Sequence, residues 1–148
     1  MTLQQINHVK NSWLLVSRMD QELVGGIFYN RLFEVMPEVK PMFNRSTIPE
    51  QSKKLMTMLS YVIARLDRLD QIIEEIRRMA RRHTQYGVED RHYQAVGEAL
   101  LFTLEKGLGG NWNHNLGDAW SNIYQTLANA MMAAQHEEGE VVTKDKRA

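Results

Sequence analysis

The stretch 77–87 reads "RRMARRHTQYG" and sets four arginines around one histidine, His83. It is either a basic patch for nucleic acid or the end of a buried helix whose histidine points inward. Three apolar residues precede His83 at helical spacings of 4, 3 and 4: Ile72, Ile76 and Met79. Residues at these spacings share one face of a helix, whereas the arginines fall on the flanks and the solvent side. The periodicity therefore predicts that His83 lies on the buried face.

A histidine on an apolar face needs a hydrogen-bond partner, because an unsatisfied buried polar group costs about 1–3 kcal/mol. One interpretation is a neutral core histidine bonded to a backbone carbonyl; the other is a ligand of a metal or a haem. His83 lies four residues before Gly87, near a helix end, where Nδ1–H can donate to a carbonyl and leave Nε2 as a ligand. The other histidines show no metal-site spacing with it. A porphyrin, which supplies four nitrogens itself, needs only one imidazole.

The composition indicates one packed intracellular domain. The 148 residues carry 18 basic and 18 acidic side chains, so no global field attracts nucleic acid, and no cysteine is available for disulfides or thiolate sites. No apolar run is long enough to span a membrane, and the start "MTLQQINHVK" does not resemble a signal peptide. We expect a cytoplasmic protein with no membrane span and no nucleic-acid partner.

Apolar spacing is helical almost throughout, and the fold class is predicted to be all-α. Two helices are expected to open at capping-box pairs, one at Thr2 and Gln5 and one at Thr47 and Glu50. Others are expected over 24–36, 70–84, 90–107 and 114–135, with Gly87 as a natural helix stop. The inward face of the helix that opens at Thr2 is expected to be Leu3, Ile6, Val9, Trp13 and Val16. Residues 1–135 form the predicted domain, and 136–148 a charged, frayed tail.

Two polar residues interrupt apolar faces of other helices. Tyr29 lies on a stripe with Leu32 and Phe33, and Gln51 lies one turn before Leu55. Taken singly, each most commonly bonds the other or a backbone group. Together, opposite an inward histidine, they supply an O–H and an N–H beside a small ligand.

At this point the order of several motifs resembles bacterial single-domain haemoglobins and the haem domain of flavohaemoglobins. The motifs are "FYNRLF", "PEVKPMF", "PEQSKKLM", "RRHTQYGV", "HYQAVGEALL" and "DAW", in a similarity running from about residue 23 to 132. The resemblance implies a globin fold, with six to eight helices crossing steeply around a haem pocket, and haem b as cofactor.

Carried over position by position, the resemblance makes His83 the proximal ligand of the haem iron. Phe43 matches the phenylalanine that packs on the porphyrin, Tyr29 the distal tyrosine, and Gln51 the distal-helix position that is histidine in many animal globins. Lys54 falls where a cation lies near a haem propionate. Further haem-pocket positions are Leu55, Val88 and Tyr93, the last matching a tyrosine that bonds to the proximal region.

One departure concerns the proximal side. Flavohaemoglobins place a glutamate on the last helix, where this chain has Gln135 with Glu137 and Glu138 close behind. A neutral amide attracts the Nδ1–H less strongly, which weakens any peroxidase-like electron push.

The leading functional expectation is a globin that reversibly binds oxygen, and also nitric oxide and carbon monoxide, at a five-coordinate haem. Hydrogen bonds from Tyr29 and Gln51, each worth about 1.5–3 kcal/mol to a partly anionic ligand, predict high affinity and slow release. The alternatives are a nitric oxide dioxygenase served by an external reductase, a haem-based gas sensor and a haem-free interaction domain.

Overall fold

The computed structural model describes residues 1–43 and 46–147, with side chains up to residue 137. These residues form six α-helices and three 3-10 helices and contain no strand. The elements are α1 (Leu3–Ser17), α2 (Gln21–Val35), η1 (Pro37–Phe43), α3 (Ile48–Ile63), η2 (Leu66–Ile72), α4 (Ile73–Gln85), α5 (Asp90–Leu108), η3 (Gly109–Asn111) and α6 (His114–Arg147). The predicted all-α class is confirmed.

Local signals explain where several helices begin and end. Both predicted capping boxes are present, Thr2 with Gln5 at α1 and Thr47 with Glu50 at α3. Helix α2 starts earlier than expected, because the carboxylate of Asp20 caps its first amides. Gly87 adopts a left-handed φ of 84°, which ends α4 and turns the chain toward α5.

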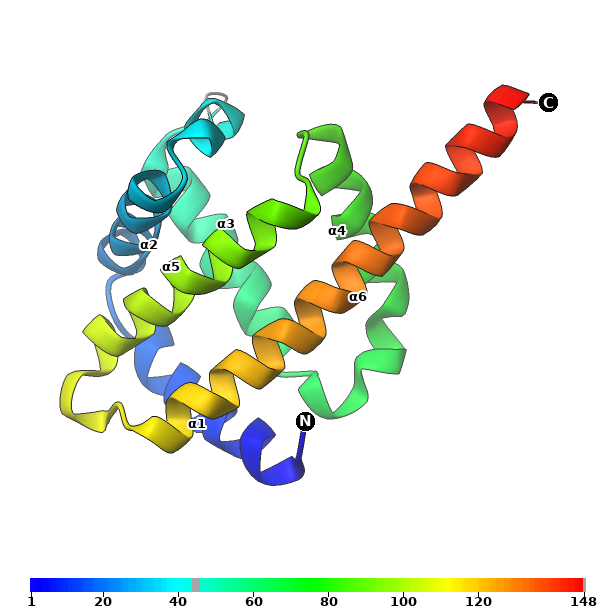
Figure 1. The fold of residues 1–148 in the computed structure, drawn as a ribbon. Coiled ribbons are helices and arrows are strands. Elements are labelled where there is room, and N and C mark those ends of the chain that lie inside the picture. The colour runs from blue at the N-terminus through cyan, green and yellow to red at the C-terminus, as the bar shows by residue number, and fades with distance from the viewer. Residues whose placement is uncertain (44–45, 148) are drawn as a thin grey trace.

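The helices cross in layers around one core (Figure 1). In Figure 1, α5 and α6 run antiparallel and side by side across the face toward the viewer, with α3 behind them. Helix α2 packs on α3 and α5, while α4 packs on α6 and η2. Two tryptophans brace α1 between its neighbours: Trp13 donates to Ser60 of α3 and Trp120 of α6 donates to Ser12, each at 2.9 Å.

The crossing of α2 over α3 depends on Gly25. A Cβ at this position would lie 1.9 Å from Ser52 Oγ and 2.8 Å from Ser52 Cα, so the two backbones approach as closely as a glycine allows. Ser52 is fully buried at this contact. The close approach sets the position of α3 relative to α2, and with it the wall that carries Gln51.

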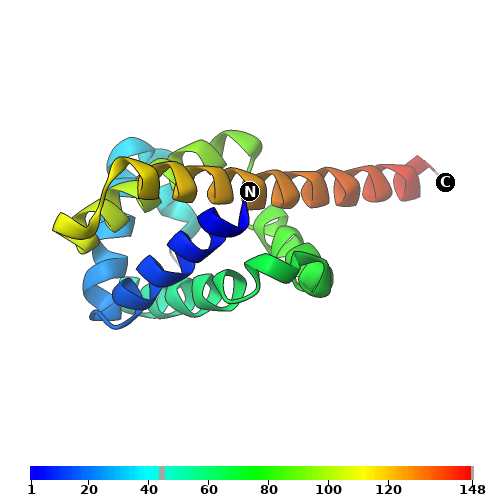
Figure 2. The same ribbon diagram turned by 90° about the horizontal axis from the view of Figure 1, so that it is seen from below.

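Two expectations about the ends of the chain are wrong. Leu3 is 69% exposed instead of inward, because it occupies the first helical position of α1 and no neighbouring element covers it. The last helix does not end near residue 135 but continues to Arg147, and its final part extends past the rest of the molecule (Figure 2). Each added residue of an existing helix gains one backbone hydrogen bond, so a charged segment without proline can remain helical. Of the expected tail, the side chains after Glu137 lie outside the described residues.

None of the described helices is both long and apolar enough to cross a membrane.

Candidate functional site

The His83 side chain is half-buried on the inward face of α4, as the periodicity predicts. Its helix buries Ile76 and Ala80 on the same side, and the four neighbouring arginines are exposed. The His83 Nδ1 lies 2.6 Å from the backbone carbonyl of Met79, so Nδ1 carries the proton of the neutral ring. The Nε2 atom makes no hydrogen bond to any described residue. Burial lowers the pKa of the imidazole, and the Nε2 lone pair is available for a ligand.

The outer face of α4 is mixed in charge, not a continuous basic patch. Arg77 pairs with Glu74 at 2.8 Å, and Arg78 lies 3.8 Å from Glu75. Exposed pairs of this kind contribute little to stability, but they offset the charge of Arg77 and of Arg78. The nucleic-acid interpretation therefore gains no support from this face.

A second polar group, Gln135 of α6, anchors the end of α4. Its Oε1 accepts the phenol proton of Tyr93 at 2.5 Å, and its Nε2 donates to the Val88 carbonyl at 2.9 Å and to Thr84 Oγ1 at 3.1 Å. Gln135 is 8% exposed. One buried carboxamide thus connects α4, the α4–α5 corner, α5 and α6.

The same network places the residues that the resemblance singled out on this side. Val88 N–H donates to the carbonyl of His83 at 2.9 Å, which fixes the corner directly to the histidine backbone. Burial, with a smaller contribution from the charge of Asp90, raises the pKa of Tyr93 to about 12, so its phenol stays protonated. The residue that bonds to Tyr93 is Gln135, whereas Glu137 is exposed. The side chain of Glu138 lies outside the described residues.

Tyr29, Gln51 and Phe43 come together on a different wall, formed by α2, η1 and α3. The Tyr29 ring meets Phe43 edge-on at a centroid distance of 5.3 Å. Its hydroxyl donates to the Gln51 backbone carbonyl at 3.4 Å, the long end of the hydrogen-bond range, and burial raises its pKa to about 12. The Gln51 side chain donates to Ser46 Oγ. Tyr29 therefore bonds to a backbone group, as the simpler interpretation expected, whereas the Gln51 side chain bonds to a serine hydroxyl, which it did not.

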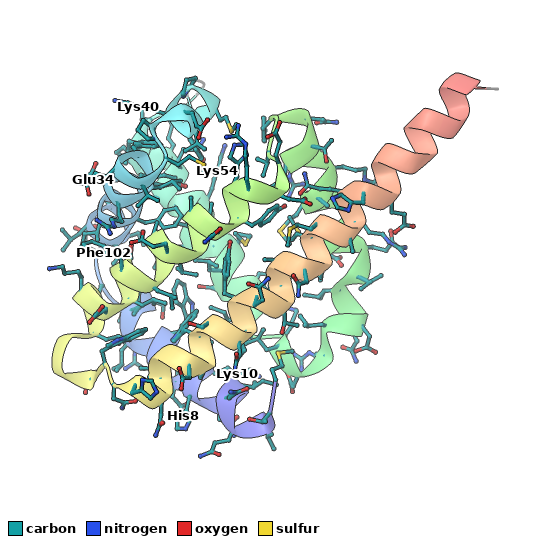
Figure 3. The ribbon with its side chains drawn as sticks, in the orientation of Figure 1. His8, Lys10, Glu34, Lys40, Lys54 and Phe102 are labelled. Carbon is teal, nitrogen blue, oxygen red and sulfur yellow. The ribbon has the colours of Figure 1, made fainter. Side chains whose placement is uncertain are left out.

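Between α3 and α4 lies a cavity of about 480 Å³. This is within the range of small-molecule and cofactor sites. Met58 of α3 and Met79 of α4, whose carbonyl accepts from His83, line its apolar part, and four cations stand around it: Lys53, Lys54, Arg78 and Arg82. In Figure 3, Lys54 lies at the opposite end of the molecule from His8 and Lys10 on α1. Leu55, next to Lys54, is half-buried and packs against the core.

The donor set indicates which cofactor the site can hold. Within the described part of the chain, no three histidine, cysteine or carboxylate side chains gather as metal ligands. An ion held at His83 would need its remaining ligands from outside the protein, and a porphyrin provides four of them. Met58 and Met79 offer an apolar surface for such a ring, while Lys54 and Arg82 offer positive charge for its carboxylates. These residues fit a haem.

Sequence reasoning missed three contributors: Ser46, Thr84 and Met58. Thr84 could have been suspected from the sequence, because it directly follows His83; in the structure it bonds to Gln135 of α6. Ser46 precedes the helix cap Thr47 and carried no such signal. Met58 was assigned only to the packed face of its helix. A cavity between two faces is not visible from the spacing within either of them.

Comparison with known proteins identifies the family. The Globin family profile matches residues 27–131. The anaerobic nitrite reductase GLB0 of Physcomitrium patens is 30% identical over 91% of this chain and 82% of its own length. The flavohemoprotein of Bacillus subtilis is 26% identical over 78% of this chain, which spans only 30% of that protein. A Campylobacter jejuni globin structure superposes with a TM-score of 0.82 at 26% identity, covering 94% of this chain and 99% of that one. The chain belongs to the globin family, whose members bind haem.

Proposed function

We propose that this globin holds haem b between α3 and α4, with His83 Nε2 as the proximal ligand, and binds dioxygen reversibly on the opposite side. The observation that carries the proposal is the state of His83. It is a half-buried neutral imidazole with Nδ1 committed to the Met79 carbonyl and Nε2 without a partner. When bound, ferrous haem supplies an iron that takes up diatomic gases, including nitric oxide and carbon monoxide.

Different residues would contact different parts of the haem. Met58 and Met79 contribute an apolar lining, and Phe43 offers a flat ring beside Tyr29 on the wall formed by α2, η1 and α3. Lys54 and Arg82 supply charge for the two propionates. Met79 has a second role, because its carbonyl keeps the His83 ring in one tautomer and one orientation.

Tyr29 is the donor that stabilises a gas ligand. Its pKa of about 12 keeps the phenol protonated at neutral pH, and its present bond to the Gln51 carbonyl is long. Exchanging this bond for one to a partly anionic ligand gains about 1.5–3 kcal/mol, which slows ligand release roughly 10- to 100-fold. The Gln51 amide has two N–H donors and uses one on Ser46, so a second donor remains for the same ligand.

Titration with haemin tests the proposal directly. A strong Soret band should grow to one haem per chain, and reduction under nitrogen should give a five-coordinate ferrous spectrum, because position 51 carries no histidine. Air should convert it reversibly to an oxygenated form. A colourless chain would contradict the proposal, and a six-coordinate ferrous spectrum would contradict the open ligand site.

An enzymatic use of the same pocket remains the second candidate. The Physcomitrium patens relative is named as a nitrite reductase. Oxidation of nitric oxide to nitrate is another candidate reaction, and it would consume the dioxygen that an oxygen carrier binds. Either reaction needs electrons from a reductase. Turnover of nitric oxide or nitrite by the haem-loaded chain with a flavin reductase, at rates far above haem alone, would favour the enzyme over the oxygen carrier.

A further inference from the structure

The end of α4 is held by a group that the proposed function does not use. Gln135 is buried, lies on α6, makes no hydrogen bond to the imidazole of His83 and is not among the residues that line the cavity. It instead bonds to Tyr93, to the residue directly after His83, and to the corner residue whose amide bonds to the His83 carbonyl. These bonds join segments 42 to 51 positions apart along the chain.

The chemistry of the carboxamide matches this position better than that of a carboxylate. The oxygen accepts one proton, from the Tyr93 phenol, and the two N–H groups each donate, one to the Val88 carbonyl and one to Thr84 Oγ1. An ionised carboxylate could accept from Tyr93 but has no hydrogen for Val88, and would face that carbonyl oxygen at hydrogen-bond distance. The amide can donate two hydrogen bonds and accept one, as its neighbours require, whereas an ionised acid can only accept.

The electronic state of His83 is set elsewhere. Its Nδ1 proton goes to the neutral carbonyl of Met79 within α4, and no carboxylate is within hydrogen-bond distance of the ring among the described residues. Gln135 can affect the histidine only through the backbone of Thr84 and Val88. The two roles, orienting the ring and anchoring its helix, belong to different residues.

We propose that Gln135 is a positioning residue that clamps the end of α4 and the α4–α5 corner to α6, and so holds His83 by geometry rather than by charge. The clamp needs both amide donors. Its action on a bound haem rests on the proposed function, but the clamp itself is a property of the chain with or without haem.

Amide hydrogen exchange at Val88 in the haem-free chain tests the clamp, because this amide donates to the His83 carbonyl. In Gln135→Glu and in Gln135→Leu, Val88 should exchange about 10- to 100-fold faster at pH 8, since each loses both donations. In Gln135→Glu alone, protection should return in part at pH 5, where a protonated acid restores one of the two donations, the one to the Val88 carbonyl. Protection at pH 8 equal to that of the parent in Gln135→Glu would overturn the proposal.

Two further variants guard against general loss of structure. Tyr93→Phe removes only the bond to the amide oxygen, so Val88 should keep its parental exchange rate. Thr103→Val removes a buried hydroxyl within α5, away from the clamp, and should also leave Val88 unchanged. The nearby Asp90–His136 ion pair is common to all variants, so its effect cancels in the comparison. If Tyr93→Phe or Thr103→Val accelerates Val88 as much as the Gln135 variants do, the clamp is not specific and the proposal fails.

The haem-loaded protein separates geometry from charge. The iron–histidine stretching band in the ferrous state should move in the same direction, or broaden, in Gln135→Glu and Gln135→Leu. An upward shift confined to Gln135→Glu would show that charge at residue 135 reaches the imidazole, and would overturn the proposal. A chain that takes up no haem would refute the proposed function, while the exchange result would still decide on the clamp.

Discussion

The two polar walls of the site are built in opposite ways. On the His83 side, Gln135 uses its amide oxygen and both N–H groups in bonds of 2.5 to 3.1 Å, and His83 itself bonds at 2.6 Å to a backbone carbonyl. On the Tyr29 side, the phenol makes one bond of 3.4 Å, and the Gln51 amide has a donor to spare. A saturated network keeps one arrangement, whereas a weakly bonded donor can be redirected at low cost. The first wall suits a permanent ligand and the second a ligand that comes and goes.

The largest effect is expected from the wall that holds the cofactor. His83→Ala removes the imidazole nitrogen proposed to bind the iron, so stoichiometric haem binding, followed by the Soret band, should be lost. His8→Ala, at an exposed position on α1 far from Lys54 (Figure 3), is the matched control and should bind haem normally. Retention of a full Soret band by His83→Ala would show that another residue binds the iron.

The opposite wall should respond in kinetics, not in haem content. Tyr29→Phe removes the strongest donor and should speed oxygen release about 10- to 100-fold, measured by stopped flow with a competing ligand. Haem content should stay the same, because the lost bond to the Gln51 carbonyl is long. Tyr86→Phe, at the exposed end of α4 and outside the cavity lining, should leave the rate unaltered. An unchanged off-rate in Tyr29→Phe would remove the functional difference between the two walls.

The position of the distal wall depends on the α2–α3 crossing. Gly25→Ala places a Cβ 2.8 Å from the Ser52 Cα, which a backbone must move to accommodate, and should lower the free energy of unfolding by about 1–3 kcal/mol. Gly26→Ala meets nothing within 4 Å and should instead stabilise the helix by about 0.5–1 kcal/mol. Urea denaturation of both variants measures the difference. Equal stability in the two would contradict the close approach.

The smallest effect concerns protonation of the proximal wall. Burial lowers the pKa of His83, so the unfolded chain takes up the proton at a higher pH than the folded chain. The contribution of this residue to stability is complete above about pH 6.5 and is lost as the pH falls through the folded pKa. Denaturation of the haem-free chain between pH 8 and 5 should therefore show a shallower loss of stability in His83→Gln than in the parent. Identical pH profiles would mean that His83 does not titrate differently on folding.

Much of the fold follows from features that are local in the chain. The capping boxes at Thr2 and Thr47, the stop at Gly87 and the inward face of α4 were all predicted, because caps and helical periodicity depend on residues within about one turn. The exposed Leu3 and the continuation of α6 to Arg147 were predicted incorrectly. Both depend on whether another element covers a helix end, which no local pattern reports.

The site shows the same division. From its own sequence the chain determines that His83 points inward, that Tyr29 and Gln51 interrupt apolar faces, and that an amide stands at 135. Only the tertiary structure decided that Gln135 bonds to Thr84, Val88 and Tyr93, that Gln51 bonds to Ser46, and that a cavity of about 480 Å³ separates α3 from α4. The reason is physical: a helix fixes the direction of a side chain from its nearest neighbours, whereas its partner is set by how distant helices cross, and here by how closely Gly25 lets two of them approach.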